Sequence, residues 1–171
     1  MANSYSDYTV IRVTPTLTAD SAYSDGDVLF DPTEIPNAVM GKGGCSKLLR
    51  FYLLDKSKQT FDAQFYFCEA NTSFATSNMH NTANITDANL SVAKICAVVT
   101  KDHDQGEVAD LDNAKFHQLK GLDGGDDVAF PTLLQAAAGS TSVFVTAILS
   151  SDTPTFGETD DLELILHIQR R

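Results

Sequence analysis

The chain has 171 residues, of which 43% are hydrophobic and 20% are charged. This length suits a single domain that buries its own hydrophobic core without disulfides or a structural metal ion. The formal net charge of −11 repels a phosphate backbone, which disfavours direct nucleic-acid binding, and no apolar stretch approaches the ~20 residues of a membrane-spanning helix.

Apolar and polar residues alternate along several short runs, most clearly in 61–67 (FDAQFYF) and 162–168 (LELILHI). A β-strand sends successive side chains to opposite faces, so this period predicts strands with one buried face. We therefore predict an all-β fold: residues 1–171 form one antiparallel, jelly-roll-like β-sandwich, with 1–8 as a possible extended N-terminal arm. The nine expected strands are 9–18, 28–39, 47–55, 60–69, 93–101, 114–120, 128–135, 142–150 and 161–169.

The connections between these runs are rich in Gly, Pro, Asp and Asn, which favour turns. Pro32, Pro36 and Pro131 fall within predicted strands, and because proline cannot donate to a β-ladder, those strands are expected at a sheet edge or at a bulge. Thr86 is a candidate N-cap for one short helix near 86–93. The long polar stretch 70–87 is either a contact arm or a loop without a role.

Five side chains are candidate contacts with a partner protein. Tyr5 and Tyr8 belong to the N-terminal arm, Tyr23 follows it, and Met79 and His80 lie in the polar stretch. Tyrosine is suited to contact surfaces because it combines a large apolar ring with a polar tip.

Two acidic clusters could in principle bind a cation. Asp123, Asp126 and Asp127 surround a Gly-Gly turn, and 102–104 reads Asp-His-Asp. The first lacks the spacing of an EF-hand loop and the second needs ligands from elsewhere in the fold, so we interpret both as solvated loops and predict no metal site and no cofactor.

No catalytic motif accompanies the strand pattern, which predicts a protein that is not an enzyme. Glycosidase-type carboxylate pairs are assembled only in three dimensions and stay open as an alternative. Cys68 and Cys96 lie in apolar runs and are expected to be small buried hydrophobic residues, while Cys45 completes an odd, widely spaced set. The first residues lack the features of a signal peptide, so folding in a cytosol is expected.

Residues 23–30 (YSDGDVLF), 34–39 (EIPNAV), the glycine-rich turn 41–44 and 48–55 (LLRFYLLD) resemble small structural proteins of tailed bacteriophages, especially aquatic ones. The similarity continues through 61–67, 85–88 and 151–156. The resemblance implies a β-sandwich decoration (cement) protein on the outside of the head. It would bind the major capsid protein and itself, as a trimer or dimer, after synthesis in the host cytoplasm, and it brings no active-site residues.

Two other functions stay open at this point. One is a receptor- or glycan-binding domain of a head fibre or tail structure, although the absence of Trp removes the usual aromatic platform for sugars. The other is a small β-sandwich hydrolase that acts on polysaccharide.

Overall fold

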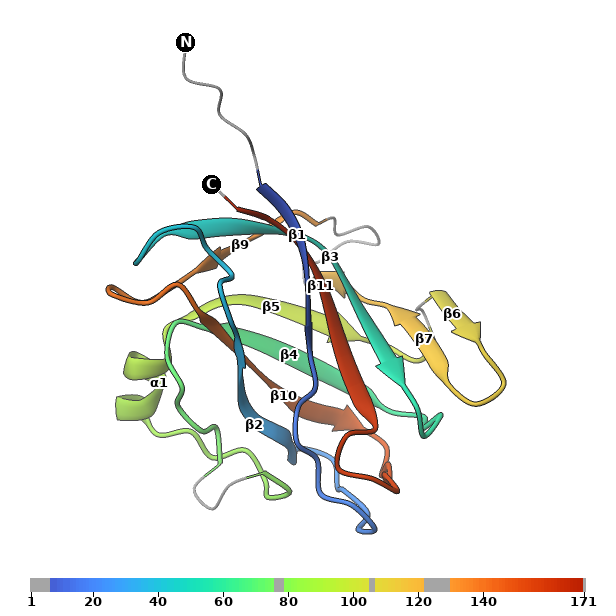
Figure 1. Cartoon of the computed structure of the whole chain (residues 1–171). Helices are drawn as coiled ribbons and strands as arrows, with labels where there is room; N and C mark the ends of the chain where they lie inside the picture. Colours follow the sequence, from blue (N-terminus) through green and yellow to red (C-terminus); the bar gives the residue numbers. More distant parts are fainter. Residues whose placement is uncertain (1–6, 76–78, 105–106, 122–129, 171) are drawn as a thin grey trace.

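The computed structural model describes residues 7–75, 79–104, 107–121 and 130–170 (Figure 1). These residues form eleven strands and one helix, α1 (Asp87–Ala93). The strands are β1 (Asp7–Val13), β2 (Val28–Ile35), β3 (Cys45–Asp55), β4 (Asp62–Cys68), β5 (Ile95–Lys101), β6 (Glu107–Asp110), β7 (Lys115–Gln118), β8 (Lys120–Gly121), β9 (Thr132–Gln135), β10 (Val143–Ser151) and β11 (Leu162–Arg170).

The strands make two antiparallel sheets that pack face to face. The six-stranded sheet has the order β1-β11-β3-β7-β6, with β9 also paired to β3, and the five-stranded sheet has the order β2-β10-β4-β5-β8. Figure 1 shows β1 and β11 crossing in front of β4 and β10. The chain passes from one sheet to the other at every connection except those from β4 to β5 and from β6 to β7. Such repeated crossing between two antiparallel sheets is typical of a jelly roll. The predicted all-β sandwich is confirmed.

Phenylalanine side chains from both sheets interlock between the layers. Phe51 of β3 makes edge-to-face contacts with Phe65 and Phe67 of β4, at ring-centroid distances of 5.2 and 5.5 Å, and Phe30 of β2 lies 6.2 Å from Phe65. All four are fully buried. Aromatic pairs prefer such tilted geometries, so the contacts add specific packing to the burial of apolar area.

The structure has eleven described strands where about nine were expected, because one apolar run divides between the sheets and the short strand β6 is added. The expected strand 114–120 becomes β7 in the six-stranded sheet and β8 in the five-stranded sheet. Leu119 between them is buried and donates its N–H to the carbonyl of Phe51 at 2.9 Å. Strand β6 was not predicted because its four residues include two acids and show no alternation.

The predictions for Thr86 and for Pro32 are confirmed, whereas Pro36 and Pro131 lie just outside β2 and β9 and not within strands. Helix α1 begins after Thr86, whose hydroxyl accepts a hydrogen bond from the N–H of Asn89 at 3.2 Å, and ends at Lys94 in the left-handed conformation. Pro32 lies in β2, an edge strand whose pairing with β10 shifts register opposite residues 30–33. Because proline lacks an N–H, an edge with a bulge tolerates it.

The polar stretch after β4 is not a free contact arm in its described parts. Residues 70–75 and 79–94, which we call the covering segment, pack on the outer side of the five-stranded sheet. Phe74 and Ala93 form a second hydrophobic cluster with Cys68, and His80 donates its N–H to the carbonyl of Val28 at 2.8 Å. The outer side of this sheet is therefore used by the chain itself.

Within the described ranges, no helix has both the length and the apolar character needed to cross a membrane.

The interlocked phenylalanines predict unequal costs for two truncations. Phe65→Ala leaves a cavity between the sheets and should lower the free energy of unfolding by about 3–5 kcal/mol. Phe116→Ala removes a ring that stacks on Tyr52 outside the core and should cost only about 1 kcal/mol. Urea titrations of both variants measure the difference, and equal losses would contradict this assignment of the core.

Candidate binding face and histidine–carboxylate cluster

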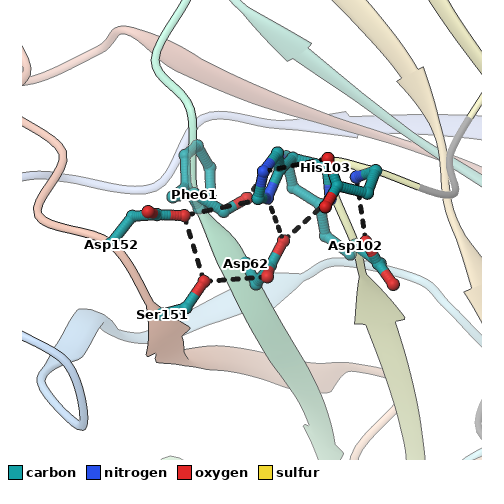
Figure 2. A network of polar contacts seen from close by, with 8 residues as sticks. Phe61, Asp62, Asp102, His103, Ser151 and Asp152 are labelled. Carbon is teal, nitrogen blue, oxygen red and sulfur yellow. Dashed lines mark hydrogen bonds and ion pairs between the residues drawn. The ribbon is translucent and has the colours of Figure 1, made fainter.

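A histidine–carboxylate cluster lies where β4 begins and where β5 and β10 end (Figure 2). The Nδ1 atom of His103 lies 2.8 Å from Oδ1 of Asp62, and the backbone N–H of His103 donates to the same oxygen at 2.7 Å. The other oxygen of Asp62 accepts a hydrogen bond from the hydroxyl of Ser151 at 2.8 Å. Asp152 and Asp104 approach the imidazole at 3.7 and 3.2 Å.

The carboxylates favour the charged imidazole. The side-chain hydrogen bond that Asp62 accepts from His103 is the main cause that raises the pKa of His103, and the charges of Asp62, Asp104 and Asp152 add to it. Burial of Asp62 opposes its ionisation, but hydrogen bonds from His103 and Ser151 outweigh that effect and lower its pKa. When His103 is protonated, it forms an ion pair with Asp62 that ties the ends of three strands together.

The order of contacts in the cluster differs from that of a hydrolytic triad. In a triad the histidine takes the proton of the serine, and the carboxylate orients the histidine from the other side. Here Ser151 donates to carboxylates, while the two ring nitrogens face Asp62 and Asp104. The hydroxyl is therefore not activated as a nucleophile by His103.

A cation could meet three ligand atoms at this place, because Asp62, His103 and Asp152 each offer one within 4.8 Å of the others. Binding would have to displace the proton that Nδ1 of His103 shares with Asp62, since a metal needs the neutral imidazole. The prediction that 102–104 forms only a solvated loop omitted these long-range contacts of His103.

A second polar group lies inside the sandwich next to this cluster. Lys101 is 1% exposed, its ammonium lies 3.9 Å from the centroid of the Phe61 ring, and it donates to the carbonyl of Phe61. Burial lowers the pKa of Lys101 to about 8 and raises that of Asp55 to about 6. Burial also lowers the pKa of His117 to about 4, so that its ring is neutral at physiological pH. The depth of these groups points to a structural role.

The predicted contact residues have different outcomes. Tyr23 is fully buried, so its assignment as a contact residue is wrong: its hydroxyl donates to the carbonyl of Leu29 at 3.0 Å inside the core. His80 packs against the Tyr23 ring at 4.4 Å, and Met79 packs against the second hydrophobic cluster. Tyr8 is 66% exposed on β1 and stays available.

Several other candidates lie outside the described residues. They are Tyr5 and the acidic turn with Asp123, Asp126 and Asp127. The predicted arm 1–8 is described only from Asp7, where β1 already begins and pairs with β11. The prediction of a small buried hydrophobic residue is confirmed for Cys68, whose burial raises its pKa to about 12. Cys96, for which the same was expected, is only half-buried.

The outward side of the six-stranded sheet is the more informative surface. Cross-strand pairing places Tyr8 opposite Gln169, Gln169 opposite Lys47, and Lys47 opposite Leu133, so these four side chains form one row across β1, β11, β3 and β9. We call the whole surface the outer face. The same pairing gives its residues with described side chains as Tyr8, Val10, Arg12, Cys45, Lys47, Arg50, Tyr52, Leu54, Ala109, Phe116, Gln118, Leu133, Gln135, Glu163, Ile165, His167 and Gln169.

The outer face is both apolar and basic. Tyr8, Val10 and Leu133 are 66, 52 and 58% exposed. The rings of Tyr52 and Phe116 stack at 5.1 Å on the same side. Arg12, Lys47 and Arg50 are its lysine and arginine residues, and Glu163, which pairs with Arg12 at 2.8 Å, is its acid. On a chain with a net charge of −11, this local excess of positive charge is a distinct feature.

Sequence reasoning missed most of this surface, although a signal was present. The outward positions of a half-buried strand are expected to be polar, whereas in β1 and β9 several of them are Tyr, Val and Leu. When apolar residues point to both faces of a strand, the outward ones are either covered by another part of the chain or belong to a contact surface.

Comparison of the chain with models of known protein families and with curated proteins finds no match.

The cluster predicts a pH window for stability. Because the pKa of His103 is raised, its contribution is complete below the ordinary value of 6.5 and is lost as pH rises through the raised pKa. Because the pKa of Asp62 is lowered from 3.8, the contribution is also lost as pH falls through that lowered pKa. The difference in unfolding free energy between the wild type and Asp62→Asn should therefore be largest between pH 3.8 and 6.5.

The same variant gives a direct spectroscopic check. In an NMR titration, Asp62→Asn should lower the pKa of His103 more than Asp104→Asn does, because Asp104 is exposed and contributes only through its charge. An unchanged pKa of His103 in Asp62→Asn would show that the ion pair does not exist in solution.

Proposed function

We propose that this chain is a non-enzymatic virion protein, a decoration protein that binds the outer surface of a bacteriophage capsid and stabilises the head. The observation that carries the proposal is the asymmetry of the two sheets. The covering segment occupies the outer side of the five-stranded sheet, whereas the outer face of the six-stranded sheet presents Tyr8, Val10 and Leu133 to solvent. The kind of partner that we propose comes from the expected resemblance to phage structural proteins, which the comparisons with known families and curated proteins do not test.

The composition of the outer face supports a protein partner. Exposed apolar and aromatic residues with arginine are the residue types enriched at protein interfaces. The stacked pair of Tyr52 and Phe116 lies among them. The positive charge of Arg12, Lys47 and Arg50 favours an acidic region of the shell, while the negative remainder of the chain would be repelled by it. Charge would thus orient the protein on its partner as it binds.

Repetition by symmetry supports binding through a modest surface. A head displays many copies of the same site, so an interface that is weak in one copy holds well when several copies act together. Jelly rolls host many unrelated functions, so the fold is compatible with the proposed function but does not by itself favour it.

The cluster around His103 supports a role without catalysis. Its serine donates to Asp62 and Asp152, and the two ring nitrogens of His103 face Asp62 and Asp104. The serine hydroxyl therefore has no hydrogen bond to the imidazole, which a histidine acting as general base toward that hydroxyl would need.

A second candidate is the receptor-side module that recognises a surface glycan. It is favoured by the aromatic rings of the outer face, which are the exposed Tyr8 on β1 and, separately, the stacked pair of Tyr52 on β3 and Phe116 on β7. A sugar ring could lie against such an apolar platform. The two functions differ in ligand, and both would use the outer face.

The test is co-sedimentation of the purified chain with expanded, DNA-free heads assembled from the major capsid protein of the same genome. A decoration protein should saturate a fixed number of sites per head and raise the temperature at which the heads come apart. Failure to bind heads, together with binding on a glycan array, would replace the proposal with the receptor-side module.

The charge of the outer face predicts a selective loss of binding. Arg50→Glu should weaken the affinity for expanded heads by about tenfold or more, because it places an acid where the partner is expected to be acidic. Lys94→Glu makes the same charge change beside α1, on the covered side of the sandwich, and should alter affinity by less than about twofold. Equal effects of the two substitutions would show that only total charge matters.

A further inference from the structure

Five described strands, β1, β2, β6, β8 and β9, pair on one side only, and they differ in how well the other side is protected. Edge strands expose unpaired N–H and C=O groups, and proteins usually shield them by shortness, proline, bulges or a covering segment. Strand β2 has Pro32, a register shift and hydrogen bonds from the covering segment. Strand β6 has four residues and β8 has two. Strand β9 has four residues and directly follows Pro131.

Strand β1 has none of these protections in its described residues. It has seven residues, Asp7 to Val13, without proline or lysine, and pairs with β11 in an unbroken register. Tyr, Thr, Val and Ile give it high β-propensity. Among the described residues, β1 pairs with β11 alone, so its opposite edge is available to a further strand.

We propose that β1 pairs with β1 of a second copy of this chain, antiparallel and centred on Val10. Val10 is the middle residue of the strand, so this register is the one that pairs all seven residues. Each chain then continues the six-stranded sheet of the other. The inference concerns self-association and does not depend on what the outer face binds.

The outward residues of β1 are self-complementary in this register. Tyr8 lies opposite Arg12 of the second copy, and Arg12 lies opposite its Tyr8, so each guanidinium meets an aromatic ring. Val10 lies opposite the second Val10, an apolar pair that is 52% exposed in the single chain. Among these outward residues no like charges lie directly opposite each other, because the pairs are Tyr8 with Arg12 and Val10 with Val10. Each Arg12 also keeps the ion pair with Glu163 of its own chain.

The symmetry also fits the remaining surface. The two-fold axis runs through Val10 perpendicular to the sheet, so the outer faces of both copies point in the same direction and join into one larger surface. The interface is narrow, and the net charge of −11 on each copy opposes association. We therefore expect a weak dimer that strengthens when salt screens this repulsion.

Sedimentation equilibrium of the full chain, from about 10 µM to about 1 mM in ~0.3 M salt, tests the dimer. The wild type should shift from monomer to dimer with concentration. Val10→Glu should raise the dissociation constant by about tenfold or more, because a residue on the two-fold axis faces its own copy and one substitution brings two carboxylates together. Leu133→Glu is the matched control: it makes the same change at a similarly exposed site on β9 and should leave the dimer intact.

A disulfide trap tests the register in the same protein. In a Cys45→Ser background, Val10→Cys should form a disulfide-linked dimer on mild oxidation, because directly opposed Cβ atoms lie ~4.5–5.5 Å apart, close to disulfide range. Leu133→Cys should remain unlinked. A wild type that stays monomeric at every concentration, an equal effect of the two Glu substitutions, or trapping that does not prefer position 10 would each overturn the proposal.

Discussion

The structure depends on one constraint: the inward side chains of two sheets must fill a single layer between them. Phe51 meets Phe65 and Phe67 at that layer, and Phe30 extends the contact to β2. Because strands alternate, fixing the inward residues also fixes which residues point outward. The outer face is therefore a consequence of the core, and a one-residue shift in the register of β1 would turn Tyr8 and Val10 inward.

The chain uses its two outward surfaces differently. One side receives the covering segment, which buries Phe74 and Cys68 in a second hydrophobic cluster. The other side keeps exposed apolar rings beside arginine and lysine on an otherwise acidic chain. At the end of the sandwich, Asp62 and His103 hold three strand ends together by an ion pair, so polar chemistry there serves the fold. These features are what a rigid module that docks through one side requires.

The sequence was sufficient for elements whose signal is local. The alternation in 61–67 and 162–168 predicts β4 and β11, and Thr86 predicts the start of α1, because period and capping act over a few residues. It was insufficient where contacts between distant residues decide. The division of 114–120 at Leu119 depends on a hydrogen bond to Phe51, and Tyr23 is buried because its hydroxyl meets Leu29 inside the core. His103 was noticed in an Asp-His-Asp run, but its main partner, Asp62, lies 41 positions earlier.

A cryo-electron-microscopy reconstruction of a head saturated with the chain tests the central claim most directly. The account predicts that the outer face, with β1, β11 and β3, lies against the shell, while α1 and the covering segment point away from it. Density that places the covered five-stranded sheet or the strand-end loops on the shell, with the outer face toward solvent, would contradict the account.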